Sequence, residues 1–296
     1  MLSKYLYSLI LEFTAHNAAT LPIGTGHQTH ALFLNIVAQV DPALSKRLHD
    51  EPNYRPFTVS SLRGPTEQGK HLLLQPGQLC RLRVTLLDGG PLWQALSTCF
   101  LEGRLTIVSL GTAELTLHHL LSTPKADPTG WAGSTDWQSL ATTAASEHIT
   151  LQFASPTAFS LGDRRFGLFP EPRLVWDSLM RSWNLYAPAV LRLDKAELRA
   201  FVEKQVAVED HHLSVETRRF PTHTQKGFVG TCTYHVKAKD GYAPQVAALA
   251  EFARFSGIGS KTTMGMGQAR REIDSIQHKE NVEVSDSVVE VINKIS

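Results

Sequence analysis

Between Gly257 and Gly267 the chain reads GIGSKTTMGMG, with four glycines in eleven residues. The stretch follows a helix predicted over Ala243–Phe255, where Ala and Leu recur every three to four residues, and leads into a strand predicted over Gly265–Ile273. This order excludes a Walker loop and a Rossmann fingerprint, because both place a strand before the glycines and a helix after them. Glycine backbone can approach a polyanion closely, and Lys261 adds a cation. The alternative is a purely structural connection from helix to strand.

The segments before this loop complete one β-α-β-β-α-β unit with one additional helix. Hydrophobic patterning predicts, in order, a strand over His148–Ser155, helices over Glu171–Tyr186 and Asp194–Gln205, and long strands over Val206–Phe220 and Gly227–Ala238. Together with the helix and strand that flank the glycine loop, this is the element order of a ferredoxin-like domain.

The first half of the chain shows the same order. We predict a strand over Lys4–Phe13, a helix over His27–Val40, a short helix opened by Asp41-Pro42, strands over Phe57–Leu62 and Leu79–Leu87, a helix over Pro91–Glu102, and strands over Arg104–Leu110 and Glu114–Leu121. The sequence therefore predicts an α+β protein of two tandem ferredoxin-like (βαββαβ, RRM-like) domains. We place them at residues 1–124 and 147–273, with a linker at 125–146 and an acidic tail at 274–296.

Charge is distributed unevenly along the chain. The 29 Lys and Arg residues nearly balance the 28 Asp and Glu residues, for a net charge of +1. Six of the acids and two of the bases follow Arg271, so the body before the tail carries +5. Such a body can hold a basic groove for nucleic acid. Arg81 and Arg83 alternate along one predicted strand as basic points, and exposed arginines of this kind are most often simply solvated.

Several classes of protein are excluded by composition. The three cysteines, Cys80, Cys99 and Cys232, form no CxxC pair, which argues against a zinc ribbon and a disulfide scaffold. No apolar run reaches 18 residues, so we expect no transmembrane helix and a cytoplasmic protein. No histidine or carboxylate set has the spacing of metal ligands, and we expect neither a metal nor another cofactor.

Histidines supply the candidates for proton transfer. His49 falls at the end of the short helix, where a helix C-terminus favours a cation, and Arg55 beyond Pro52 could fold back beside it to hold a phosphate. The plain alternative for His49 is a surface residue paired with Asp50. His27 and His30, in the first turn of the preceding helix, are the second candidates.

Three segments carry a resemblance to a known family. They are Asp41–Leu62 (DPALSKRLHDEPNYRPFTVSSL), Glu147–Phe159 with Arg173–Trp183 after it, and the glycine loop. Their order and spacing, over nearly the whole chain up to about Ile273, resemble the CRISPR-associated repeat-cleaving endoribonucleases of the repeat-associated mysterious protein superfamily.

The resemblance implies two tandem ferredoxin-like domains and metal-independent cleavage of CRISPR precursor RNA within its repeats. The ribose 2′-OH would attack the adjacent phosphate and leave a 2′,3′-cyclic phosphate and a 5′-OH end. The family's histidine pattern falls on His49 as a catalytic residue, and Arg55 stands where relatives have a lysine. The residues expected to bind RNA are Gly257, Gly259, Lys261, Gly265 and Gly267.

Two questions stay open at this point. The pattern does not identify the general base, which keeps His27 and His30 as candidates. The same fold also suits a non-catalytic crRNA-binding subunit of a CRISPR effector complex, and fold alone does not decide between the two. The expected partners are CRISPR repeat RNA and, as further candidates, subunits of an effector complex, but no membrane.

Overall fold

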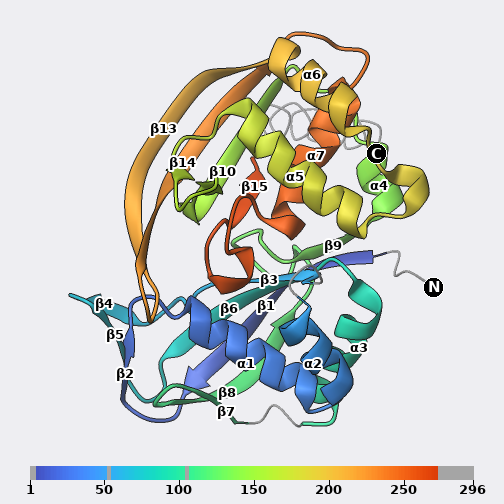
Figure 1. The fold of residues 1–296 in the computed structure, drawn as a ribbon. Helices are drawn as coiled ribbons and strands as arrows, with labels where there is room; N and C mark the ends of the chain where they lie inside the picture. Colours follow the sequence, from blue (N-terminus) through green and yellow to red (C-terminus); the bar gives the residue numbers. More distant parts are fainter. Residues whose placement is uncertain (1–4, 52–54, 104–106, 273–296) are drawn as a thin grey trace, which may run out of the picture.

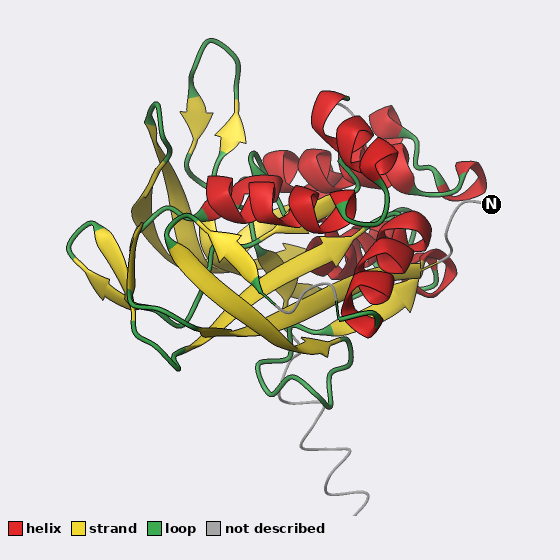
Figure 2. Ribbon diagram, turned by 90° about the horizontal axis from the view of Figure 1, so that it is seen from below, coloured by secondary structure: helices red, strands yellow, loops and turns green. Residues whose placement is uncertain are grey.

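Two antiparallel sheets, each with its own helices, lie one above the other in a computed structural model that describes residues 5–51, 55–103 and 107–272 (Figure 1). The view from below shows most helices gathered at one side and the long strands and hairpins at the other (Figure 2). The acidic tail predicted at 274–296 lies outside the described residues.

The first domain has the predicted ferredoxin-like order. Its main sheet runs β3-β6-β1-β8-β7, and the elements are β1 (Tyr5–Ala15), α1 (Gly26–Ala38), α2 (Pro42–Asp50), β3 (Phe57–Val59), β6 (Leu79–Leu86), α3 (Gly89–Leu101), β7 (Val108–Leu110) and β8 (Ala113–Leu121). Asp41 caps α2 as predicted, since its carboxylate accepts the Leu44 amide at 2.8 Å. A small sheet that the sequence did not predict adds β2 (Ala19–Pro22), β4 (Thr66–Gln68) and β5 (His71–Leu74).

The second domain repeats the order, with its sheet running β13-β14-β10-β15. Its elements are β10 (His148–Thr157), the hairpin β11 (Phe159–Ser160) and β12 (Phe166–Gly167), α5 (Pro172–Tyr186), the 3₁₀ turn η1 (Ala189–Leu191), α6 (Lys195–Gln205), β13 (Val206–Arg219), β14 (Thr224–Val236), α7 (Ala243–Ser256), the 3₁₀ turn η2 (Thr262–Met264) and β15 (Ala269–Arg271). The prediction of two tandem ferredoxin-like domains is confirmed.

The final strand is shorter than predicted. It covers Ala269–Arg271 rather than Gly265–Ile273, of which Ile273 lies outside the described residues. Gly265 and Gly267 have φ values of 82° and 68°, which a strand cannot accommodate. The glycine loop therefore extends to the start of the strand.

The segment predicted as a linker carries secondary structure that joins the two domains. Within it, β9 (Gly133–Asp136) pairs with the start of β1, so it extends the first sheet. The following helix α4 (Trp137–Ala141) sends Trp137 into the second core, where its ring meets Trp183 edge-on with centroids 5.2 Å apart. The segment is thus built into both domains.

Successive side chains of β1 point to opposite faces of the first sheet, and the two faces differ in character. Leu9, Leu11 and Phe13 pack under α1 and α3. Ser8, Ile10 and Glu12 point the other way, toward the second domain. The face opposite the helices is therefore polar and belongs to the contact between the domains.

Arg83 lies in that contact and is not the solvated basic point expected from the sequence. Its side chain, in a residue only 7% exposed, donates to Ser8 Oγ at 3.0 Å, to Gln268 Oε1 and to the carbonyl of Arg254 at the end of α7. The three cysteines are buried thiols, in agreement with a place in the core. None of the helices in the described parts of the chain has the length and apolar character needed to cross a membrane.

Gly26, the first residue of α1, lies in close backbone contact with the second domain. A Cβ at Gly26 would collide with the backbone carbonyl of Met264 in the glycine loop. Gly26→Ala should therefore lower the free energy of unfolding by about 1–3 kcal/mol, measured by urea denaturation. Elsewhere in a helix the same change stabilises by up to about 1 kcal/mol, so a stabilised variant would contradict this contact.

Candidate functional site

His30 lies where α1 meets the glycine loop. Its Nδ1 lies 3.0 Å from the carbonyl oxygen of Thr263, and its ring stacks on Phe57 of β3 with centroids 5.6 Å apart. Because a carbonyl only accepts, Nδ1 carries the proton and Nε2 is the basic nitrogen of the neutral ring. The residue is 8% exposed.

The predicted acid–base residues come together around this ring. Burial lowers the pKa of His30, the hydrogen bond to Thr263 opposes that change, and the charges of Arg55, His27 and His49 lower it further. These charges act on the ring, so Arg55, His27 and His49 lie within electrostatic range of His30, and we refer to the four residues as the His30 cluster. Because its pKa is lowered, His30 is neutral near pH 7. His27 is exposed, at the edge of the cluster.

His49, like His27, is an exposed member of the cluster. Its side chain, on the last turn of α2, is 74% exposed, and Nδ1 lies 3.0 Å from Asp50 Oδ1. A hydrogen bond from Lys46 and, to a smaller extent, one from His49 lower the pKa of Asp50. A surface hollow of about 400 Å³ between α1 and α2 opens beside it, lined in part by Asn35.

Arg55 lies two residues before β3. Its amide donates to the hydroxyl of Tyr186 at 3.0 Å, and Tyr186 is the last residue of α5 in the other domain. Its side-chain Nε is buried and has no hydrogen-bond partner among the described residues. Sequence reasoning missed Tyr186, which lies outside the motifs and far along the chain from Arg55. It included Thr263 in the glycine loop but did not predict the contact of its carbonyl with His30.

The four glycines of the loop have a structural role in its backbone conformation and in its contacts with neighbouring elements. Their φ values lie between 64° and 85°, so each needs the freedom of glycine. The amide of Gly257 donates to Ala253, that of Gly259 to Ser178 Oγ, that of Gly265 to Val59 and that of Gly267 to Pro156. These amides are therefore not available to a phosphate, contrary to the cradle expected from the sequence. RNA binding by these residues stays a prediction.

Lys261 projects from the same loop toward the tip of the β13–β14 hairpin. Its backbone is left-handed with φ at 59°, and its Nζ lies 3.9 Å from the centroid of the Phe220 ring and contacts His223 Nε2. Burial lowers the pKa of Lys261. Its ammonium is thus held against an aromatic ring of the second domain.

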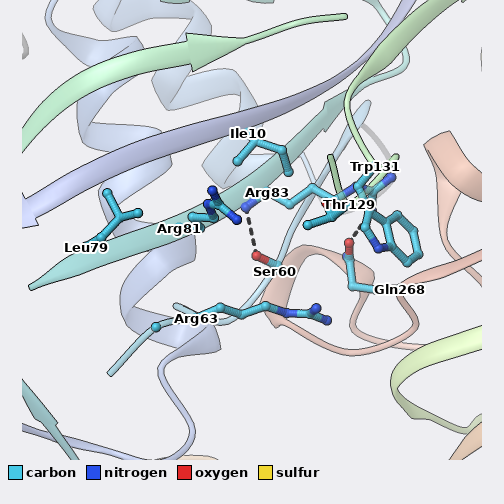
Figure 3. A pocket seen from close by; sticks show the side chains of 10 residues that line it. Ile10, Ser60, Arg63, Leu79, Arg81, Arg83, Thr129, Trp131 and Gln268 are labelled. Atoms are coloured by element: carbon cyan, nitrogen blue, oxygen red, sulfur yellow. Dashed lines mark hydrogen bonds between the residues drawn. The ribbon is translucent and has the colours of Figure 1, made fainter. Parts of the chain in front are cut away.

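A cavity of about 350 Å³ lies between the domains on the polar face of the first sheet (Figure 3). Arg63, Arg81 and Arg83 line it together with Trp131 and Gln268. Two guanidinium groups lie over the Trp131 ring. The guanidinium carbon of Arg83 is 4.5 Å from the ring centroid, and that of Arg270 is 4.4 Å from it.

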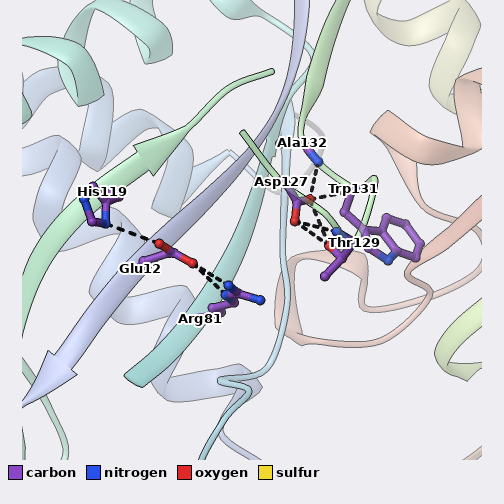
Figure 4. A network of polar contacts seen from close by, with 7 residues as sticks. All are labelled: Glu12, Arg81, His119, Asp127, Thr129, Trp131 and Ala132. Carbon is purple, nitrogen blue, oxygen red and sulfur yellow. Dashed lines mark hydrogen bonds and ion pairs between the residues drawn. The ribbon is translucent and has the colours of Figure 1, made fainter. Parts of the chain in front are cut away.

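Two carboxylates organise the rim of this cavity (Figure 4). The Glu12 carboxylate lies between two partners: Oε1 is 2.7 Å from the Arg81 guanidinium, and Oε2 is 3.3 Å from His119 Nδ1. Asp127 accepts the amides of Trp131 and Ala132, both at 2.8 Å, and so fixes the turn that carries Trp131. Burial raises the pKa of Asp127, but hydrogen bonds from Thr129, Ala132 and Trp131 outweigh this and leave it lowered.

The cluster around His30 has the parts of a proton-transfer site. The neutral ring of His30 can accept a proton, the exposed ring of His49 can donate one, and the cation of Arg55 can stabilise negative charge. In the ranges that the structure describes, no group of three or more His, Cys, Asp or Glu residues is arranged to hold a metal ion.

The lowered pKa of His30 predicts a contribution to acid sensitivity. The unfolded chain binds a proton at this residue near pH 6.5 while the folded chain resists it, so stability is lost as the pH falls below that value. Thermal unfolding between pH 8 and pH 5 should show a smaller fall in Tm for His30→Gln than for the wild type. An equal fall in both proteins would show that His30 titrates normally.

Comparisons with known proteins agree with both halves of this fold. A family model described as the CRISPR Cas6 N-terminal domain matches residues 5–142, and one described as CRISPR-associated endoribonuclease Cas6 matches residues 151–269. The curated CRISPR-associated endoribonuclease Cas6 of Mycobacterium tuberculosis is 31% identical over 122 residues, which are 40% of this chain and 37% of that protein. Its counterpart from Streptococcus thermophilus is 27% identical over 127 residues, 42% of this chain and 51% of that protein.

Solved structures match over more of the chain. A Cas6 product complex is similar with a TM-score of 0.76 and 28% identity, covering 91% of this chain and 100% of that one. Thermus thermophilus Cas6 is similar with a TM-score of 0.68 and 27% identity, covering 91% and 99%. The matches to the curated relatives span only about a third to a half of their lengths. The two family models between them cover both domains, and the chain belongs to the family of CRISPR-associated endoribonucleases called Cas6.

Proposed function

We propose that the chain cuts CRISPR precursor RNA within its repeats, without a metal ion, and leaves a 2′,3′-cyclic phosphate and a 5′-OH end. The observation that carries the proposal is the buried ring of His30, which is hydrogen-bonded to the Thr263 carbonyl of the glycine loop and feels the charges of Arg55 and His49. Membership of the Cas6 family supports the same substrate class.

In this proposal each residue has one role. Nε2 of the neutral His30 takes the proton of the ribose 2′-OH as its oxygen attacks the adjacent phosphorus. The bond from phosphorus to the 5′ oxygen breaks, and protonated His49 gives that oxygen a proton. Arg55 stabilises the negative charge that develops on the phosphate. His27, exposed at the edge of the cluster, is the alternative base.

The sharpest test of this proposal is His49→Ala, assayed by single-turnover cleavage of labelled repeat RNA in EDTA. Loss of the proton donor should slow cleavage by about 10²–10⁴-fold and leave RNA affinity nearly intact. Arg55→Ala should slow cleavage and also weaken binding, because a phosphate contact acts in both the ground state and the transition state. The products should carry the two expected ends.

The control for His49→Ala is His119→Ala, an exposed histidine paired with Glu12 on the opposite face of the first sheet, which should cleave normally. Normal cleavage by His49→Ala, with activity lost in His27→Ala or His30→Ala, would place all proton transfer on α1. Activity that disappears in EDTA and returns with a divalent ion would rule out the mechanism. A protein that binds repeat RNA but never cuts it would be a non-catalytic subunit.

Lys261 is proposed to contact an RNA phosphate. Lys261→Ala should weaken repeat RNA binding and reduce the slope of log affinity against log salt by about one charge. Lys70, on the turn between β4 and β5, offers a matched control when changed to Ala. An unchanged affinity and slope for Lys261→Ala would leave the loop with a structural role only.

A further inference from the structure

Tyr186 belongs to the second domain, yet its hydroxyl lies at the backbone of a candidate catalytic residue of the first. It accepts the Arg55 amide at 3.0 Å. Burial raises the pKa of Tyr186, while the hydrogen bond from Arg55 and the charge of Arg55 oppose that change. The phenol is therefore neutral over the physiological pH range. The contact spans 131 residues of sequence, so it forms only when the domains are docked.

The end of α5 that carries Tyr186 is held on both sides. The indole of Trp183, in a residue only 2% exposed, donates to the Leu191 carbonyl at 2.7 Å. Asn184 makes two hydrogen bonds with the backbone of Leu193, both at 2.8 Å. The Ala187 amide donates the last hydrogen bond of the helix to the Trp183 carbonyl at 2.8 Å. These four bonds fix the last turn, so the position of the Tyr186 hydroxyl is set by a rigid element.

The backbone around Arg55 is held by hydrogen bonds on both sides of the residue. Arg55 precedes Pro56, which restricts its backbone to extended conformations. The Pro56 carbonyl accepts the Leu87 amide at 2.7 Å, which attaches the chain to the end of β6. The bond to Tyr186 holds the residue on its other side. These two bonds fix the backbone at Arg55, from which the side chain begins with its Nε buried.

We propose that Tyr186 is a positioning residue that holds the guanidinium of Arg55 at the scissile phosphate, so that the second domain completes the reaction centre of the first. This inference rests on the role proposed for Arg55 above. The hydroxyl acts through the Arg55 backbone and not on the RNA. Its loss should therefore change the rate of the chemical step more than the affinity for RNA, since a displaced guanidinium loses geometry while other contacts still bind the substrate.

Tyr186→Phe removes the hydroxyl alone and is the variant of choice. We expect single-turnover cleavage at saturating repeat RNA to slow about tenfold, with the half-saturating RNA concentration unchanged within twofold. Hydrogen exchange at the Arg55 amide should accelerate, which reports the lost bond independently of activity. Tyr234→Phe is the matched control, because its hydroxyl donates to the Pro170 carbonyl at 2.8 Å inside the second core. That variant should lose thermal stability and keep the cleavage rate.

A double-mutant cycle with Arg55→Ala decides whether Tyr186 acts through Arg55. Once Arg55 is gone, Tyr186→Phe should slow cleavage no further. An equal slowing in both backgrounds, or wild-type cleavage by Tyr186→Phe alone, would overturn the inference while leaving the proposed function in place. A wild-type protein that cuts no repeat RNA would instead refute the proposed function. Wild-type cleavage by Arg55→Ala would remove the role of Arg55 and this inference together.

Discussion

The Arg83 guanidinium, buried between the two domains without an acidic hydrogen-bond partner among the described residues, is the contact on which the rest of this structure depends. Burial lowers its pKa, and the charges of Arg254, Arg63 and Arg270 lower it further, with Asp127 opposing. A buried cation is costly unless its donors find acceptors. Here one acceptor is the Arg254 carbonyl at the C-terminal end of α7, where the helix dipole is negative.

A neighbouring hydrogen bond on the same strand also holds the second domain on the first. Thr85, next but one to Arg83 along β6, donates its hydroxyl to the Phe255 carbonyl at 2.6 Å. The end of α7 is thus seated on the polar face of the first sheet, and the glycine loop leaves α7 at this point. The left-handed backbone of Gly257 turns the chain toward α1 and β3. The position of the loop, and with it the Thr263 carbonyl at His30, follows from how α7 is held.

The contact between the domains also concentrates positive charge. Burial lowers the pKa values of Arg63, Arg83 and Arg254, the charge of Arg270 lowers all three further, and the Asp127 carboxylate opposes this change at Arg83. Arg81 at the rim is already paired with Glu12. A net charge of +1 for the chain gives no hint of this cluster, because it averages over residues that the fold brings together.

Local patterns determined the secondary structure of this protein, and through it the fold class. Periodicity located the long helices, Asp41 capped α2, and two β-α-β-β-α-β runs indicated tandem ferredoxin-like domains. These features depend on neighbours within a few residues, which a sequence displays directly. The histidine candidates His27, His30 and His49, together with Arg55, were likewise visible as residues in a short stretch.

Only the tertiary structure decided which partners those residues have. The linker prediction missed β9 and α4, since their pairing and burial depend on β1 and the second core. The glycines, expected to offer free amides, donate to carbonyls and a hydroxyl from other elements. The neutral state of His30 and the anchoring of Arg55 by Tyr186 arise from contacts between the domains. Burial and long-range hydrogen bonds are set by packing across 131 or more residues, which local sequence patterns do not encode.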